Sequence, residues 1–254
     1  MYDITIKKGG MVYKAEKVPL AGVTTYEIPL TTLKVNFPGV KSVNQTTISV
    51  GSTSVVSKDW TNDKAEFTLF KGLTYNLKVQ KGGMVHEATV TCNEGEVSYD
   101  VPLSKLTVKF PGVKSVNKTT VSVGSTSVTS NDWQSDETMF TLFKGLIYNL
   151  KIQKGGMIHE ATVTCDKDEV SYDAPLTKLT VNFTGVKSVN QITVSANSTQ
   201  VTTKDWVNDS TTFILFKDVT YNLKLQKGTM VHEGSIICDE SKETYDVPTY
   251  NGTF

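Results

Sequence analysis

Three pairs of adjacent residues, each a histidine followed by a glutamate, are the first candidates for chemistry in this chain: His86, His159 and His232. A cysteine follows each histidine six positions later. In an extended strand these residues span roughly 20 Å, so a histidine and its cysteine are too far apart to share a metal ion. The sequence also lacks the H-E-x-x-H, G-x-S-x-G and phosphate-binding glycine motifs. We therefore expect surface or edge histidines, no catalytic site, and neither a metal nor a cofactor.

The cysteines are Cys92, Cys165 and Cys238, and none has a second cysteine close to it in the sequence. A small buried apolar residue at the end of a strand is the favoured interpretation. A disulfide to a neighbouring chain and metal binding are the alternatives.

A second recurring pattern is Asp-Trp, with a further aspartate three positions after the tryptophan. The pairs are Asp59-Trp60, Asp132-Trp133 and Asp205-Trp206. Two carboxylates beside a tryptophan could hold Ca²⁺ or stack a sugar ring. Asp and Asn also simply form turns, and a tryptophan in a small β domain is usually part of the core. The structural interpretation is favoured, and a ligand-binding loop is the alternative.

Acceptor motifs for N-glycosylation, Asn-x-Ser/Thr, occur at Asn44, Asn117, Asn182, Asn197, Asn208 and Asn251. They predict a rod that carries sugars if the protein is secreted by a cell that attaches them.

These candidates recur because the whole chain repeats every 73 residues without an insertion: the interval separates Trp60 from Trp133 and Tyr75 from Tyr148. A fixed period is typical of one structural unit repeated in tandem. It predicts a partial unit over residues 1–29, holding the last three strands of a unit. Complete units are predicted over residues 30–102, 103–175 and 176–254, the last with a short tail.

Within a unit, apolar and polar residues alternate in short runs, and helical spacing is absent. Leu33 and Val35, for example, alternate with polar residues, and Gly, Pro, Asn and Asp separate about seven such runs. The pattern predicts an all-β fold, a tandem array of small antiparallel β-sandwich domains. Asn197 and Asp218 replace glycines of the other units, so we expect turns with positive φ there.

The segment from Leu69 to Tyr75 reads L-x-x-G-x-x-Y and resembles the tyrosine corner of fibronectin-III and immunoglobulin-like sandwiches, in which the hydroxyl bonds to upstream backbone. The pattern recurs at Tyr148 and, with Asp218 in place of the glycine, at Tyr221. The layout of the whole unit is similar to the CnaB-like repeats of bacterial surface proteins. This resemblance implies an extracellular or cell-surface protein with a structural or adhesive role. It does not imply the internal Lys–Asn bond of some CnaB-like domains, because the first-strand position reads Asn36, Lys109 and Asn182.

Only four residues, Pro102 to Lys105, separate the end of one unit at Val101 from the start of the next at Leu106. Proline fixes φ, and so short a linker leaves little freedom between domains. We therefore expect a stiff rod.

The opening segment, residues 1–29, lacks the first strands of its unit, so its apolar face would be bare in an isolated molecule. Either the chain is cut from a longer array, or another copy or another protein covers these strands and joins subunits end to end by strand addition. Apolar residues replace a cysteine and a polar loop in this segment, which favours a contact. The predicted assembly surface comprises Ile4, Ile6, Pro19, Leu20, Thr249, Tyr250 and Phe254.

All 26 basic residues are lysines, and the formal net charge is zero. Without arginine the chain lacks the usual bidentate donor to guanine and phosphate, so we expect no nucleic-acid partner. No run of 18 apolar residues occurs, so we expect no membrane span. The first hypothesis is a self-associating extracellular fibre, filament or stalk protein. The alternative is a repeated adhesin module that binds carbohydrate or protein through the Asp-Trp loops.

Overall fold

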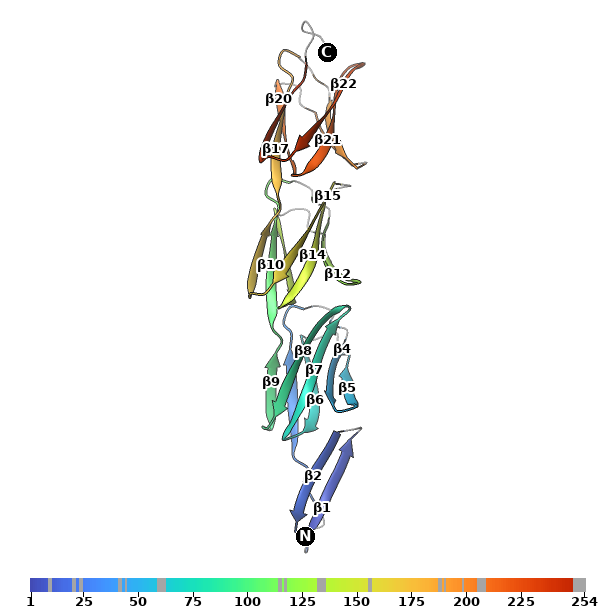
Figure 1. The fold of residues 1–254 in the computed structure, drawn as a ribbon, viewed down its shortest axis with the longest axis vertical. Helices are drawn as coiled ribbons and strands as arrows, with labels where there is room; N and C mark the ends of the chain where they lie inside the picture. Colours follow the sequence, from blue (N-terminus) through green and yellow to red (C-terminus); the bar gives the residue numbers. More distant parts are fainter. Residues whose placement is uncertain are drawn as a thin grey trace.

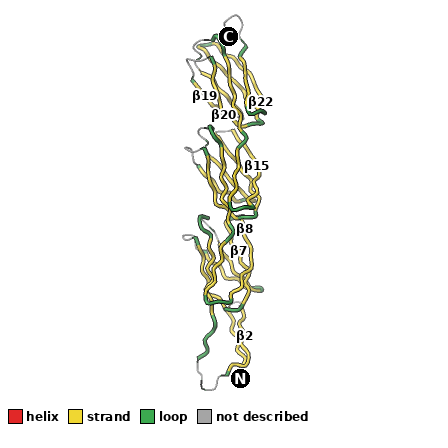
Figure 2. The backbone as a smooth tube through the Cα atoms, turned by 90° about the vertical axis from the view of Figure 1, so that its left-hand side faces the viewer, coloured by secondary structure: helices red, strands yellow, loops and turns green. Residues whose placement is uncertain are grey.

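The computed structural model describes the chain with short gaps, and every regular element in the described part is a β-strand (Figures 1 and 2). Because that part contains no helix, it contains no helix able to cross a membrane. The residues that are not described are 9–10, 20–21, 23–24, 41–42, 44, 59–62, 114–115, 117, 132–135, 155–156, 187–188, 190, 198, 205–208 and 249–254.

A hairpin opens the chain, and seven strands follow in each of three successive units. The hairpin consists of β1 (Tyr2–Lys8) and β2 (Met11–Val18). The first unit holds β3 (Leu30–Asn36), β4 (Gln45–Val50), β5 (Thr53–Ser57), β6 (Lys64–Phe70), β7 (Leu73–Lys81), β8 (Met84–Cys92) and β9 (Glu96–Asp100). The second holds β10 (Leu103–Lys109), β11 (Lys118–Val123), β12 (Thr126–Ser130), β13 (Glu137–Phe143), β14 (Leu146–Lys154), β15 (Met157–Cys165) and β16 (Glu169–Asp173). The third holds β17 (Leu176–Asn182), β18 (Gln191–Ala196), β19 (Thr199–Thr203), β20 (Ser210–Phe216), β21 (Val219–Lys227), β22 (Met230–Cys238) and β23 (Lys242–Asp246).

Each unit forms a three-stranded and a four-stranded sheet with the same strand order throughout. In the first unit the orders are β6-β3-β9 and β5-β4-β7-β8. Alternate residues of both sheets point into one core, where Leu33 and Val35 of β3 and Leu77 and Val79 of β7 are buried. The predicted all-β class of tandem sandwiches is confirmed.

One strand pair in each unit is parallel, which the alternation pattern did not predict. β3 pairs with β9 in parallel, with Leu33 opposite Val97, and β10 with β16 and β17 with β23 do the same. Because the first and last strands run in one direction, the chain enters a unit at one end and leaves it at the other. The next unit therefore follows in line, and the hairpin and three units form an extended rod (Figure 1).

The predicted tyrosine corners are present in all three units. The buried hydroxyl of Tyr75 donates to the carbonyl oxygen of Phe70 at 2.8 Å, and Tyr148 and Tyr221 make the same bond at 2.8 and 3.0 Å. Burial raises the pKa of Tyr75 to about 12, so this hydroxyl keeps its proton and remains a donor.

The predicted positive-φ turns are confirmed. Asn197 has φ of 46° and Asp218 of 59°, and Gly51 and Gly72 at the corresponding positions of the first unit also have positive φ, at 57° and 87°.

In its described residues the opening segment forms two strands, whereas the repeat predicts three. β1 and β2 pair as β7 and β8 do, but residues 25–29 contain no strand. The corresponding last strand of the first unit, β9, pairs only with β3, and this chain holds no counterpart of β3 for the opening segment. A strand without a hydrogen-bonding neighbour does not form. The sheets group the strands as the repeat does, while the domain borders after residues 29, 102 and 175 stay a prediction.

Candidate functional site: the joints and a repeated groove

A histidine near the start of β8 and of β15 lies at the joint with the next unit. A hydrogen bond of 2.9 Å joins Nε2 of His86 to the Tyr99 hydroxyl of the same unit. The His86 ring also lies 6.4 Å from the ring of Phe143, which belongs to the next unit. At the second joint, His159 lies 5.8 Å from Phe216. These histidines, expected at a surface or edge, therefore contact two units at once.

A methionine two positions before each histidine fills the joint. Met84 and Met157 are 1% and 2% exposed, whereas Met230, at the same position of the third unit, is 40% exposed. The difference is the surface that the following unit removes from water at the first two joints. A flexible thioether chain is suited to such an irregular apolar gap.

Turns at the end of one unit contact strands at the start of the next. The Gly83 N–H donates to the Thr126 hydroxyl across the first joint. A Cβ built on Gly39 would lie 3.4 Å from the Thr141 hydroxyl, so this Pro-Gly turn is also in contact with the following unit. The joint thus has two contacts besides the connecting chain.

The connecting backbone is itself hydrogen-bonded to both units. Only Val101 and Pro102 lie between β9 and β10. The Val101 N–H donates to the carbonyl oxygen of Asn36 at 2.9 Å, and the Lys144 N–H donates to that of Pro102 at 3.0 Å. Bending at this linker would break one of these bonds.

Burial at the joints favours neutral side chains. It lowers the pKa of His86 and of His159. The Asp218 carboxylate, in the turn of the third unit, acts in the opposite direction on the pKa of His159. Burial also lowers the pKa of Lys81 and of Lys154, at the end of β7 and of β14.

The opening hairpin makes the same kind of joint with the first unit. Met11 is 0% exposed, and Tyr13 takes the place of the histidine, with its ring 5.9 Å from Phe70. Its hydroxyl lies 3.0 Å from that of Tyr26, and this hydrogen bond, with burial, raises the pKa of Tyr13. The chain therefore holds three joints of one design.

The described assembly residues predicted from the sequence lie on this hairpin. Ile4 and Ile6 are half-buried and Pro19 is exposed. Tyr2 is 61% exposed, whereas Tyr75 at the equivalent position is 0% exposed. The inner face of β1 therefore lacks the second sheet that covers it in a complete unit. The other predicted assembly residues, Leu20, Thr249, Tyr250 and Phe254, lie outside the described residues.

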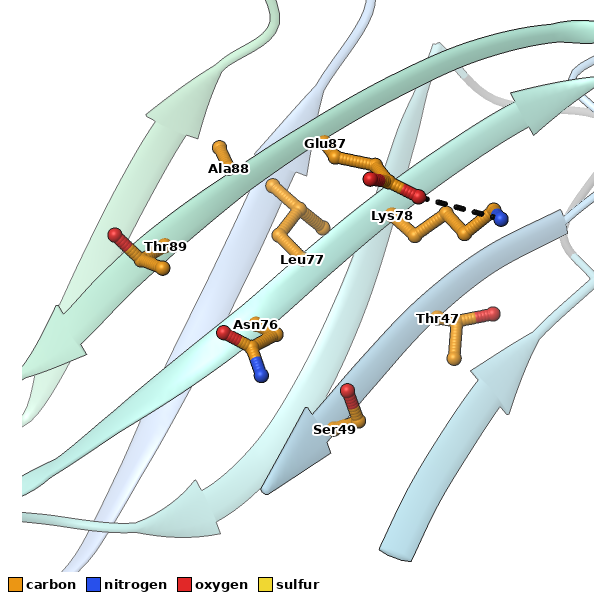
Figure 3. Close-up of a pocket in the computed structure, with 8 residues that line it drawn as sticks. All are labelled: Thr47, Ser49, Asn76, Leu77, Lys78, Glu87, Ala88 and Thr89. Atoms are coloured by element: carbon orange, nitrogen blue, oxygen red, sulfur yellow. Dashed lines mark ion pairs between the residues drawn. The ribbon is translucent and has the colours of Figure 1, made fainter. Parts of the chain in front are cut away.

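The outer face of each four-stranded sheet has a shallow polar groove (Figure 3). An ion pair of 3.3 Å between Lys78 and Glu87 crosses the first groove, which Ala88 also lines. Its lining is completed by Thr47, Ser49, Asn76, Leu77 and Thr89. The same ion pair recurs as Lys151–Glu160 at 3.0 Å and Lys224–Glu233 at 3.2 Å.

The grooves lie on one side of the rod, because the four-stranded sheets keep that side from unit to unit (Figure 1). Each presents hydroxyl and amide groups around an ion pair with no net charge. Such a lining can hydrogen-bond neutral polar groups.

Two of the six motif asparagines fall in the described residues. Asn197 is exposed in its turn. Asn182 is half-buried in β17, and its Nδ2 donates to Asp246 at 2.8 Å, a bond that an attached sugar would disturb. The motifs at Asn44, Asn117, Asn208 and Asn251, and the pairs Asp59-Trp60, Asp132-Trp133 and Asp205-Trp206, lie outside the described residues.

The three cysteines are buried free thiols at the ends of β8, β15 and β22, as the favoured interpretation predicted. Burial raises the pKa of each thiol, to about 11 for Cys238. They are therefore inert thiols at neutral pH. The described residues contain no cluster of three metal-ligating side chains.

Sequence reasoning missed the joint, although a signal for it was present. Tyr13 keeps a ring at the histidine position of the opening segment, and Met11 keeps the methionine of Met84 and Met157. The opening segment differs from the complete units elsewhere, but it keeps an aromatic ring and a methionine at these two positions. This indicates that the two positions make the same contact at each joint.

No protein-family model matches the chain, and no curated protein matches it. Solved structures similar to it include the Bacillus anthracis TIE protein, at 15% identity and a TM-score of 0.26, covering 86% of this chain and 50% of that one. They also include the Streptococcal ancillary pilin (9% identity, TM-score 0.26, 87% and 100% covered) and BcpA, the major pilin subunit of Bacillus cereus (11%, 0.22, 87% and 99%). The chain thus spans half the length of the first of these proteins.

Proposed function

We propose that the chain is a structural segment of an extracellular or cell-surface fibre, filament or stalk. The parallel pairing of β3 with β9 carries this proposal, because it sends the chain out of the far end of each unit. The linker of Val101 and Pro102, hydrogen-bonded on both sides, keeps the next unit in line. Such an array holds its two ends apart in a fixed direction, which is the task of a stalk or fibre.

Self-association at the opening hairpin is the second part of the proposal. In the first unit β4 pairs with β7 along Gln80 to Asn76, and among the described residues the equivalent edge of β1 has no such neighbour. An open edge beside a half-bare apolar face favours the addition of a strand from another copy or another protein. Ile4 and Ile6 would lie beneath the added strand.

Negative-stain microscopy of the purified chain tests the stiffness. We expect straight rods with a narrow distribution of bend angles. A variant with a Gly-Ser insertion after Pro102 is the control and should bend widely at that joint. A native chain that bends as widely as this variant would contradict the proposal.

Strand addition is tested by Ile4→Asp, with Thr5→Asp as the control on the opposite face of β1. The first substitution should prevent assembly through the hairpin and the second should leave it intact. Equal effects of the two would rule out this mode of assembly.

The second candidate function is a repeated adhesin module for neutral glycans or protein partners, favoured by the recurrence of the polar groove on one side of the rod. Several weak sites in a row bind a repeating ligand far more tightly than one. Weaker glycan-array binding by Thr89→Trp, which fills the first groove from the outer face of β8, would support it, and loss of binding in Trp60→Ala would favour a site in the Asp-Trp loop instead. In both candidate functions the protein is not an enzyme. We also propose that asparagines of its glycosylation motifs carry sugars.

A further inference from the structure

At the end of the third unit, no described residue fills the copy of the joint. We define its distal surface by Gly185, Met230, Val231, His232 and Tyr245. Met230 and Val231 are 40% and 46% exposed, and a Cβ built on Gly185 meets nothing within 4 Å. The hydrogen bond between His232 and Tyr245 is nevertheless formed, at 2.9 Å, as in the filled joints. The surface is therefore preformed.

The occupant that fits this surface is visible at the filled joints. There the same positions contact the start of a unit of the same type, through Phe143 at the first joint and Phe216 at the second. In the first unit the corresponding acceptor surface is formed by Thr68, Phe70 and Lys71.

The acceptor surface of the first unit is only partly covered by the hairpin. Thr68 and Lys71 are exposed, whereas their equivalents Thr141 and Lys144 are half-buried beneath a complete unit. The hairpin has no counterpart of the Pro-Gly turn that reaches Thr141. A complete unit would therefore cover this surface better than β1 and β2 do.

We infer that the distal surface of the third unit binds the acceptor surface of the first unit in a second copy of the chain, displacing β1 and β2. The inference rests on the proposed fibre function. Its contact between copies differs from strand addition, because strand addition leaves the hairpin in place. The interface is head to tail, and an interface of this type builds an open filament when its rotation does not close a ring.

One residue sets the strength of this contact. Thr229 stands where the first unit has Gly83, and a Cβ on Gly83 would lie 3.1 Å from the carbonyl oxygen of Val123 in the next unit. The threonine therefore requires a small shift of the incoming unit and weakens its binding. Removing the side chain should strengthen the association.

The test is sedimentation velocity of the full chain over a range of concentrations. We expect the native chain to form end-to-end dimers and longer rods, and Thr229→Gly to form them at lower concentration. Met230→Asp should weaken association at least about tenfold, because the carboxylate would be buried in an apolar joint. Met139→Asp is the matched control, since Met139 is 56% exposed and belongs to neither the distal surface nor the acceptor surface, and it should associate like the native chain. Tyr13→Ala should strengthen association, because it loosens the competing hairpin.

Association that is unchanged by Met230→Asp, or that is not strengthened by Thr229→Gly, would overturn the inference. If Ile4→Asp alone abolishes assembly, strand addition and the fibre function stand while the distal contact is wrong. If the native chain and Thr229→Gly both stay monomeric at high concentration, the inference fails and the rod shape is judged by microscopy alone.

Discussion

The Asp218 carboxylate, in a turn of the third unit, acts on the imidazole of His159 in the second unit and counteracts the lowering of its pKa by burial. The two residues belong to different sandwiches, and the joint brings them together. The first joint lacks this charge, because Gly145 occupies the turn that faces His86.

Asp218→Asn should therefore lower the pKa of His159 and leave that of His86 unchanged. Removal of a nearby negative charge disfavours the protonated imidazole. Titration of the histidine ring signals by NMR measures both values. Equal shifts of the two histidines, or none, would show that the second joint is not packed as described.

Stability should fall as the pH drops below the ordinary histidine pKa of 6.5. Because folding lowers the pKa of His86 and His159, the unfolded chain takes up protons more readily, so their contribution is present above that pH and is lost below it. The double variant His86→Gln, His159→Gln removes this titration. In urea unfolding at pH 7.5 and pH 5.0, its midpoint should change less than that of the native chain. The same change in both proteins would contradict the burial of these rings.

Tyr148→Phe should lower the free energy of unfolding by about 1–2 kcal/mol, because it leaves the carbonyl oxygen of Phe143 buried without its donor. Tyr2→Phe alters the same repeat position where the side chain is exposed, and should change stability by less than about 0.5 kcal/mol. Urea denaturation of both variants makes the comparison. A larger cost for Tyr2→Phe would mean that the hairpin is covered.

Met84→Ala should cost about 2–3 kcal/mol, because it opens a cavity in a filled joint. Met230→Ala, at the same repeat position but exposed, should cost under about 0.5 kcal/mol in dilute protein. Thermal unfolding at low concentration measures both. Similar costs would show that the following unit does not bury Met84.

The thiols of Cys92, Cys165 and Cys238 should react with a thiol reagent only when the protein unfolds, because burial blocks access and raises the pKa of each thiol. The number of reactive thiols is measured by absorbance during reaction with a disulfide reagent, with and without urea. Rapid reaction in the native protein would contradict their burial, and an intact mass above that of one chain would reveal a bond between chains.

The local structure follows from the order of residue types along the chain. Leu33 and Val35 alternate with polar neighbours, and that period places them in the core of any strand-forming chain. The tyrosine corner at Tyr75 and the left-handed turns at Asn197 and Asp218 were likewise predictable, because each depends on the conformations available to one residue in a short segment.

Which strands pair, and which residues lie between units, depends on packing between segments that are distant in the chain. The alternation of apolar and polar residues indicates which face of the sheet a side chain lies on, but not which strand lies beside it. The parallel pairing of β3 with β9 could therefore not be predicted from that alternation. His86 reads from the sequence as a surface residue, because its contact with Phe143 depends on how one sandwich follows another. Contacts between units arise from the relative placement of complete sheets, and a residue's own neighbours in the chain do not encode that placement.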